Sequence, residues 1–508
     1  MSKRVLTGRK RLALGFACGV ALALGQAPFD LMPVALAGLI AVFWLFRATT
    51  TRRQAGWLGW FFGLGYFGVS MHWIVEPFLV DLALTGWMAP FGLVGLAGGL
   101  GLFWAAAFWG AQFWRGTWAL AALVILWALA ELARGYVLTG FPWGLVGYLW
   151  TASWGIQWVS VIGPYGLTAA TLALAALAAQ ALRAGAALPG ASALCALAVA
   201  LLGGLALAGQ LQAPPEAAQP RAAEQPAPRP IVRLIQPNAA QRDKWNPDLI
   251  PTFFERQVAL TGQGPTPALV IWPETALPML LENAQTAFDI MSEAANGAPI
   301  LTGLQRFHDG GFRNTAVLLD AQGLPDQIYD KHHLVPFGEY MPLSFLFARI
   351  QIGGLAARTQ GGYVAGPGAQ LLDLGPLGTA LPLICYEAVF PQDVNAAPVR
   401  PDMILHLTND AWFGRFAGPY QHLAQARIRA IEQGLPVLRA ANTGVSAVID
   451  GKGRILASLP LNTAGALDHA IPPPLAPTIY SRTGDLPVLL LLCALLAGAF
   501  ARRLRVSH

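Results

Sequence analysis

Cys385 stands apart from the other cysteines of the chain, within the stretch LPLICYEAVF at residues 381–390. It follows a short apolar run with the character of a buried β-strand, and the carboxylate of Glu387 comes two residues later. The other three cysteines, at positions 18, 195 and 493, lie inside long apolar runs, where a thiol is usually a small core hydrophobe. Cys385 is therefore a candidate nucleophile, and the ordinary alternative is an inert buried thiol.

Two other segments carry groups that a thiol nucleophile needs. In VIWPETALP (270–278), Glu274 follows an apolar run and a proline, a position suited to a general base. In YDKHHLVPFGEYMP (329–342), Lys331 supplies a cation and Glu339 follows in a turn. The ordinary alternatives are a helix N-cap or surface ion pair for Glu274 and a solvated loop lysine for Lys331. Together, a base, a cation and a thiol are the parts needed for acyl transfer through a thioester.

The composition indicates that these segments belong to a membrane protein. Of the 508 residues, 55% are hydrophobic and only 12% are charged, whereas soluble proteins have about a quarter charged residues. The net charge of +6 is modest, and the basic residues scatter or flank apolar runs, so we expect no nucleic-acid binding. Eight apolar runs are long enough to cross a bilayer, at about 12–27, 31–47, 57–75, 88–113, 118–137, 157–182, 191–210 and 485–501.

The basic residues also predict an orientation. They precede the first run and follow the second, fourth, sixth and eighth, whereas the loops after the first and third contain only acidic charges. The positive-inside rule then predicts cytoplasmic termini and an exported segment after the seventh run. A cleaved signal peptide is the alternative for the first run, because ALALGQA resembles a cleavage site. Arg134 is an exception, and it either pairs with Glu131 one turn away or contacts another part of the protein or a lipid headgroup.

Changes in composition along the chain predict four parts. A seven-helix membrane domain occupies residues 1–211, and a Pro/Ala-rich linker follows at 212–229. In 230–478, short apolar runs alternate with amphipathic stretches, which predicts a layered α/β domain. Residues 479–508 form a final transmembrane helix and a basic cytoplasmic tail.

The motifs WPET, KHHLVPFGEY and CYE, in this order, resemble the Glu, Lys and Cys segments of the nitrilase superfamily. With NDAWFG (409–414), residues 422–444 and the apolar runs, the whole chain resembles the apolipoprotein N-acyltransferase family, a membrane-embedded branch of that superfamily. The resemblance implies a multi-pass α-helical membrane protein that carries a nitrilase-like αββα sandwich. It also implies a place in the bacterial inner membrane, with the catalytic domain on the periplasmic side.

The activity implied by the resemblance is the last step of lipoprotein maturation. An acyl chain leaves a phospholipid, usually phosphatidylethanolamine, and reaches the α-amine of the N-terminal S-diacylglyceryl cysteine of a lipoprotein. In this reaction Glu274 is the base and Cys385 is the nucleophile that forms the thioester, with ping-pong kinetics. Lys331 and the backbone N–H of Tyr386 stabilise the oxyanion.

The resemblance also suggests supporting residues. Glu339 orients Lys331 or assists the proton relay, and Glu387 positions the loop after the nucleophile. Hydrogen bonding within a tight loop is the alternative for both carboxylates. Trp245, in DKWNP, is expected in a loop over the site. Trp412 and Phe413 would flank an acyl groove, unless they are ordinary core residues.

No cofactor and no metal are expected, and the chain is expected to be a monomer. His332 and His333 are adjacent, so on an extended segment they would point to opposite sides. No cluster of cysteines or carboxylates has ligand spacing. Two other functions stay open from the residues alone. One is a membrane-tethered amidase that uses the same triad with water as acceptor, and the other is a transporter or scaffold with an inactive outer domain.

Overall fold

The computed structural model describes residues 8–184, 229–342 and 362–506. Contacts divide the chain into two compact units, one of residues 1–221 with 478–508 and the other of residues 222–477. The predicted seventh span, 191–210, lies outside the described residues.

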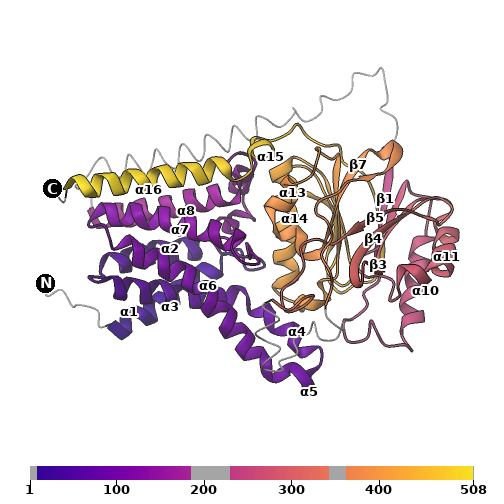
Figure 1. Cartoon of the computed structure of the whole chain (residues 1–508), viewed down its shortest axis with the longest axis horizontal. Helices are drawn as coiled ribbons and strands as arrows, with labels where there is room; N and C mark the ends of the chain where they lie inside the picture. Colours follow the sequence, from indigo (N-terminus) through magenta and orange to yellow (C-terminus); the bar gives the residue numbers. More distant parts are fainter. Residues whose placement is uncertain (1–7, 185–228, 343–361, 507–508) are drawn as a thin grey trace. The chain divides into compact units, whose positions relative to one another are not determined.

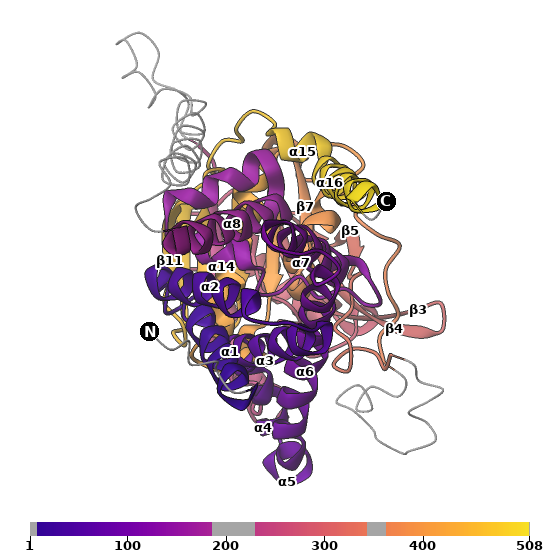
Figure 2. The ribbon, with the colours of Figure 1, turned by 90° about the vertical axis from the view of Figure 1, so that its left-hand side faces the viewer.

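The first unit is helical, and its long helices run side by side (Figures 1 and 2). These helices are α1 (Gly8–Ala23), α2 (Met32–Arg47), α3 (Arg52–Ser70), α6 (Ala89–Ala111), α7 (Thr117–Tyr136), α8 (Val159–Ala184) and α16 (Leu486–Val506). Short helices connect them, namely η1 (His72–Val75), α4 (Glu76–Leu79), α5 (Leu82–Thr85), η2 (Gly86–Met88), η3 (Val146–Trp150), η4 (Trp154–Trp158) and α15 (Ile479–Thr483).

Only some of these helices are long and apolar enough to cross a membrane. Four stretches of the described chain pass that test, at 82–111, 117–136, 154–182 and 486–505. A fifth passes only if α3 and the segment after it count as one span, and that pair is bent by 66°. Helices α1 and α2 have 16 residues each, which is about 24 Å of helix against a bilayer core of about 30 Å. The prediction of eight spans is therefore confirmed only in part.

Helices α1 and α3 approach closely because glycines line their contact. A Cβ atom on Gly19 would lie 2.0 Å from the carbonyl oxygen of Phe62. A Cβ atom on Gly65 would lie 2.3 Å from the carbonyl oxygen of Phe16. Small residues at such a crossing let two backbones pack directly, which is how membrane helices associate without a hydrophobic driving force.

Arg134 forms the intrahelical ion pair that was one of its two expected roles. Its Nη2 atom lies 2.9 Å from Glu131 Oε2, and both side chains are buried. Trp104 Nε1 donates to the other carboxylate oxygen at 2.7 Å. Arg134 also donates to the backbone carbonyl of Trp143 at 2.8 Å, so it holds the loop after α7 against the end of that helix. This buried charge is thus satisfied within the first unit.

The second unit contains two six-stranded sheets. The first has the order β12-β1-β2-β3-β4-β5 and the second has the order β11-β10-β9-β8-β7-β6. The strands of the first sheet are β1 (Ile231–Gln236), β2 (Leu269–Ile271), β3 (Ile300–His308), β4 (Gly311–Leu319), β5 (Pro325–Asp330) and β12 (Gly465–Ala470). Those of the second are β6 (Leu372–Asp373), β7 (Thr379–Ile384), β8 (Met403–Thr408), β9 (Val437–Ala441), β10 (Ser446–Ile449) and β11 (Ile455–Leu459).

Helices cover the outer face of each sheet (Figure 1). Helices α10 (Ile250–Thr261) and α11 (Gln285–Ala295) lie on the first sheet, and α13 (Pro391–Asn395) and α14 (Gly418–Gln433) lie on the second. Strands β1, β2 and β3 are parallel to one another, as are β7, β8 and β9. These central strands are buried on both faces, which explains why their sequences are nearly continuous apolar runs. The layers confirm the layered α/β domain that the apolar runs predicted and give the αββα architecture that the family resemblance implied.

We expect the Gly65→Ala variant to be less stable than the unmodified chain, because its new methyl group would overlap the α1 backbone. Overpacking of this kind costs about 1–3 kcal/mol, which lowers the apparent Tm by a few degrees. Gly68→Ala is the matched control, since Gly68 is on the same helix and has no neighbouring atom within 4 Å. Scanning fluorimetry of the full chain in detergent measures both. Equal Tm values would contradict the role given to this contact.

Candidate active site

The three proposed catalytic residues lie at the carboxyl ends of strands. Lys331 directly follows β5, Cys385 directly follows β7, and Glu274 comes three residues after β2. The carboxyl ends of strands are where α/β folds usually place their sites, because the loops there converge from several strands. Glu274 and Lys331 follow strands of the first sheet and Cys385 follows a strand of the second, so residues spread over positions 274 to 385 meet in the second unit.

A buried group of charges surrounds Lys331. Its Nζ atom donates to Glu339 at 2.9 Å and lies 3.6 Å from Glu274 Oε1. Asn314, on β4, donates through its amide to Glu274 Oε1 at 2.8 Å and to Glu339 Oε1 at 3.1 Å. The backbone N–H of Asn409 donates to Glu274 Oε2 at 2.8 Å. Both oxygens of the proposed base are therefore held, and one cation lies between two carboxylates.

The thiol of Cys385 is buried beside these charges. Burial raises its pKa well above the usual value, Glu274 raises it further, and Lys331 and a hydrogen bond with Thr408 act in the opposite direction. Burial also opposes the charge of Lys331, but Glu339 and Glu274 outweigh that effect, so the pKa of Lys331 is raised. At neutral pH the resting site has a neutral thiol and a charged lysine. A neighbouring base must remove the thiol proton before Cys385 can act as a nucleophile.

Several loops at the site hold non-glycine residues in the left-handed backbone region. Cys385 has φ 51°, Thr275, next to Glu274, has φ 44°, and Phe337, two residues before Glu339, has φ 64°. Such conformations cost roughly 1–3 kcal/mol each and persist only where the surrounding structure holds them. The backbone at the site is therefore fixed by its neighbours rather than by its own preference.

Glu387 links the turn after Cys385 to the segment after β5. One carboxylate oxygen accepts from the backbone N–H of His332 at 2.8 Å, and the other accepts from Ile384 N–H at 2.6 Å and from the Tyr329 hydroxyl at 3.0 Å. Burial opposes the charge of Glu387, but its hydrogen bonds with His332 and the Ile384 backbone hold its pKa below the usual value. This is the geometry of a residue that positions a loop.

The expectation that His332 and His333 point to opposite sides is wrong. His333 Nδ1 lies 2.8 Å from Asp393 Oδ2, and His332 Nε2 lies 3.7 Å from the same atom. Both reach one carboxylate because the chain bends at His333 instead of staying extended. In the part of the chain that the structure describes, no group of three or more His, Cys, Asp or Glu residues could hold a metal.

The three aromatic residues proposed for substrate binding have different surroundings. Trp245 lies on the loop between β1 and α10, and 43% of its surface is exposed. Phe413 is buried, and its ring packs edge-on against the His422 ring at 5.4 Å. Trp412 is half-buried. Among these three, Trp245 is the most accessible.

Lys244 is a site residue that the sequence analysis missed. Its Nζ atom donates to Thr275 Oγ1 at 2.8 Å and to the backbone carbonyl of Glu274 at 3.2 Å. Burial lowers its pKa to about 8, while Glu274 and Cys385 act in the opposite direction. The chain has only five lysines, and one next to the proposed substrate tryptophan was a signal that could have been used.

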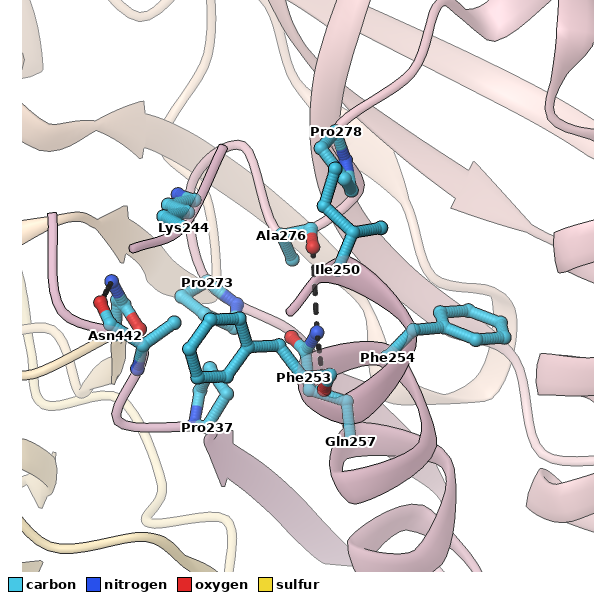
Figure 3. A pocket seen from close by; sticks show the side chains of 11 residues that line it. Pro237, Lys244, Ile250, Phe253, Phe254, Gln257, Pro273, Ala276, Pro278 and Asn442 are labelled. Carbon is cyan, nitrogen blue, oxygen red and sulfur yellow. Dashed lines mark hydrogen bonds between the residues drawn. The ribbon is translucent and has the colours of Figure 1, made fainter. Parts of the chain in front are cut away.

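Lys244 also lines a small, mainly apolar pocket (Figure 3). Phe253 and Phe254 of α10 contribute to its wall, together with Pro273, the residue before Glu274. The Gln257 amide donates to the backbone carbonyl of Ala276 at 3.3 Å and so connects α10 to the loop that contains Glu274. The loop with Lys244 and the loop with Glu274 therefore line the same pocket and are joined by the hydrogen bonds of Lys244.

Two asparagines also escaped the sequence analysis. Asn409 begins the NDAWFG motif, so the motif pointed to the segment, although its contribution is a backbone N–H that every residue type except proline has. Asn314 lies in the run NTAVLLD, where a polar residue at a strand start is common. The order of strands in the first sheet, with β4 between β3 and β5, brings it beside the two carboxylates.

Each of the two units matches the model of a known protein family. Residues 18–177 match the model for the apolipoprotein N-acyltransferase N-terminal domain, and residues 255–479 match the model for carbon-nitrogen hydrolases. The apolipoprotein N-acyltransferase of Rhodopseudomonas palustris is 36% identical over 98% of this chain and 96% of its own length. That of Caulobacter vibrioides is 38% identical over 97% of this chain and 95% of its own length.

Solved structures similar to the second unit include an amidase from Nesterenkonia sp., at 21% identity and a TM-score of 0.36, covering 52% of this chain and 96% of that one. Another is a CN-hydrolase superfamily protein from Xanthomonas campestris with an arsenic adduct in its active site, at 22% identity and a TM-score of 0.34. It covers 52% of this chain and 96% of that one.

Gly303→Ala is expected to impair the site without altering any of its functional groups. A Cβ atom there would lie 2.6 Å from the Thr275 backbone nitrogen and 2.7 Å from the Pro273 carbonyl oxygen, so the Glu274 loop must move. A small displacement of a base can lower a rate by about 10–100-fold. The measurement is acylation of Cys385 by p-nitrophenyl butyrate, followed by intact mass. Gly262→Ala, whose nearest neighbour lies at 3.5 Å, is the control, and equal rates for the two variants would refute the prediction.

Because Lys244 is buried, we predict that its contribution to the stability of the folded chain depends on pH. Its pKa is about 8 in the folded chain and about 10.4 in an unfolded one, so between these values the unfolded state binds more protons. Stability from this residue therefore rises with pH across that window and is level below it. The apparent Tm of the unmodified chain should increase relative to that of Lys244→Met between pH 8 and pH 10. A Tm difference that stays constant from pH 7 to pH 10 would rule this out.

Proposed function

Because the chain belongs to the apolipoprotein N-acyltransferase family, we propose that it transfers an acyl chain from a phospholipid to lipoproteins through a thioester on Cys385. The acyl donor is phosphatidylethanolamine. The acceptor is the α-amine of the N-terminal S-diacylglyceryl cysteine of a lipoprotein, and the kinetics are ping-pong.

One observation supports this proposal above the others. Lys331 lies between the carboxylates of Glu274 and Glu339, and the buried thiol of Cys385 interacts electrostatically with Lys331 and Glu274. A neutral buried thiol, a held carboxylate and a charged lysine supply a nucleophile, a proton acceptor and an oxyanion partner in one place. Burial of these charges costs desolvation free energy, and a scaffold without activity would gain nothing from that burial.

In the first half-reaction the Glu274 carboxylate takes the proton of the Cys385 thiol. The thiolate attacks the ester carbonyl carbon of the phospholipid, and a C–S bond forms. Lys331 and the Tyr386 N–H stabilise the negative charge on the carbonyl oxygen. The ester C–O bond then breaks, and Glu274 returns its proton to the departing oxygen of the lysophospholipid.

In the second half-reaction the lipoprotein α-amine attacks the thioester carbonyl carbon. Glu274 accepts a proton from the amine as the C–N bond forms, and the C–S bond breaks when the tetrahedral intermediate collapses. The released Cys385 thiolate then takes the proton from Glu274. The site returns to its resting state, with an amide as the product.

Supporting residues keep this machinery in position. Glu339 orients Lys331 through their 2.9 Å contact, and Glu387 fixes the turn that carries Cys385 and Tyr386. Exposed Trp245, on the loop anchored by Lys244, is suited to contact a lipid substrate. Trp412 and Phe413 are proposed to border the acyl chain.

A membrane location fits these substrates. Both are lipid-anchored, so an enzyme held at the bilayer meets them at high local concentration and in a fixed orientation. The apolar helices and the family indicate a membrane protein. We place the chain in the bacterial inner membrane as a monomer with eight spans, cytoplasmic termini and the catalytic domain on the periplasmic side.

Intact mass of the purified full chain, incubated with phosphatidylethanolamine, tests the proposal. The expected result is a gain of one acyl chain that disappears when a synthetic diacylated lipopeptide is added, because the amine discharges the thioester. Cys385→Ala should show no gain. Cys493→Ala is the matched control and should behave like the unmodified chain, since Cys493 lies exposed on α16, far along the chain from the site.

Two other results would contradict the proposal. A mass gain that persists with the lipopeptide but decays in buffer would indicate a hydrolase with water as acceptor, as in the amidase alternative. No gain with folded protein would exclude phosphatidylethanolamine as the donor.

A further inference from the structure

Two imidazoles hold the backbone carbonyl of the nucleophile residue. His422 Nε2 lies 3.1 Å from the carbonyl oxygen of Cys385, and His406 Nε2 lies 3.2 Å from the same oxygen. His406 comes from β8 and His422 from α14, and neither has any solvent-exposed surface. A carbonyl oxygen has two lone pairs, so two N–H donors satisfy it fully.

Charged neighbours decide where the ring hydrogens lie. His406 Nδ1 lies 3.3 Å from an Arg439 guanidinium nitrogen, which can only donate, so the ring hydrogen of His406 is on Nε2 and faces Cys385. Burial, together with Arg439 and His422, lowers the pKa of His406 well below the usual value, in keeping with a neutral ring.

The other imidazole lies between Asp410 and the Cys385 carbonyl. His422 Nδ1 lies 2.8 Å from Asp410 Oδ1 and 3.4 Å from an Arg439 guanidinium nitrogen, while its Nε2 faces the Cys385 carbonyl. Burial lowers the pKa of His422, although Asp410 acts in the opposite direction, so the ring is neutral, and a hydrogen bond to the carbonyl requires its hydrogen on Nε2. Asp410 is itself held by Arg439 and by the Thr408 hydroxyl, which donates at 2.9 Å. All these side chains are fully buried, and they form a connected polar network behind the nucleophile.

The rigid geometry of a peptide group links the position of the Cys385 carbonyl oxygen to the direction of the Tyr386 N–H. The peptide between Cys385 and Tyr386 is planar and trans, so its C=O and N–H point in opposite directions. Fixing the carbonyl oxygen therefore fixes the direction of the Tyr386 N–H. Cys385 needs such support, because its φ of 51° is one that non-glycine residues rarely adopt.

We propose that His406 and His422 are positioning residues that aim the Tyr386 N–H at the oxyanion formed when Cys385 is acylated. Asp410 and Arg439 set the orientation and hydrogens of the two rings. The two hydrogen bonds also polarise the peptide group and make its N–H a stronger donor. Neither imidazole contacts substrate. The inference rests on the proposed function in one respect, namely that the Tyr386 N–H binds the oxyanion.

A pair of substitutions at one position tests the contact. In His422→Gln the side-chain amide can replace Nε2 and donate to the Cys385 carbonyl. In His422→Asn the shorter amide can replace Nδ1 at Asp410, and the contact with the carbonyl is lost. We expect acylation of Cys385 by p-nitrophenyl butyrate to be roughly 10–100-fold slower in His422→Asn, below the cost of deleting an oxyanion donor outright. His422→Gln should stay within about threefold of the unmodified chain.

A second reaction distinguishes a misdirected Tyr386 N–H from a general loss of Cys385 reactivity. Alkylation of Cys385 by iodoacetamide displaces iodide at a saturated carbon and forms no oxyanion. Its rate, read as the mass gain absent in Cys385→Ala, should be nearly the same in both variants and in the unmodified chain. Equal slowing of acylation and alkylation in His422→Asn would overturn the proposal, because the network would then act on the thiol. Unchanged acylation in His422→Asn would overturn it as well.

His406→Asn and His406→Gln provide the same comparison from β8 if the His422 variants do not fold. Loss of acylation in the Asn variant and recovery in the Gln variant supports the proposal, and equal acylation rates in the two variants refute it. The nitrophenyl ester needs neither phospholipid nor lipoprotein. An unmodified chain that reacts with this ester but not with phosphatidylethanolamine would contradict the proposed donor, while the paired variants still decide the role of the imidazoles.

Discussion

A buried thiol cannot ionise by itself, and the rest of the site follows from that constraint. Burial keeps the proton on Cys385, so a base must lie within the same desolvated space. A carboxylate in that space requires a cation, which Lys331 provides, and Lys331 in turn holds a second carboxylate, Glu339. Each charge is tolerated because the next one compensates it. Removal of Lys331 would leave two buried carboxylates without the cation that lies between them.

The αββα fold supplies the rigidity that this arrangement needs. Glu274, Lys331 and Cys385 each follow a strand, and the two sheets that contain these strands each pack an apolar core under their helices. A position at the end of a paired strand leaves a residue little freedom, and backbone hydrogen bonds such as that from Asn409 to Glu274 remove more of it. Strained residues, Cys385 among them, remain in place because buried partners hold the adjoining peptide groups.

Features that depend on short sequence motifs could be predicted from the sequence. Features that depend on how distant segments pair in the fold could not. Alternating apolar runs predicted the layered domain, and three motifs indicated Glu274, Lys331 and Cys385. Asn314 could not be predicted, because the order of strands in the first sheet, and not any local motif, places it beside two carboxylates. The eight predicted spans are confirmed only in part, since apolar composition does not reveal that α1 and α2 are short or that the chain bends after α3. The expectation that His332 and His333 point to opposite sides was wrong for a similar reason, because the residue types do not reveal the bend at His333.

The most direct test of the central claim is an experimental structure of the full chain trapped as its acyl-enzyme with phosphatidylethanolamine and no acceptor. We expect an acyl group on the sulfur of Cys385. We also expect the thioester oxygen to lie about 3 Å from both Lys331 Nζ and the Tyr386 backbone nitrogen. An acyl group on another residue, or a thioester oxygen that faces away from both donors, would contradict the central claim.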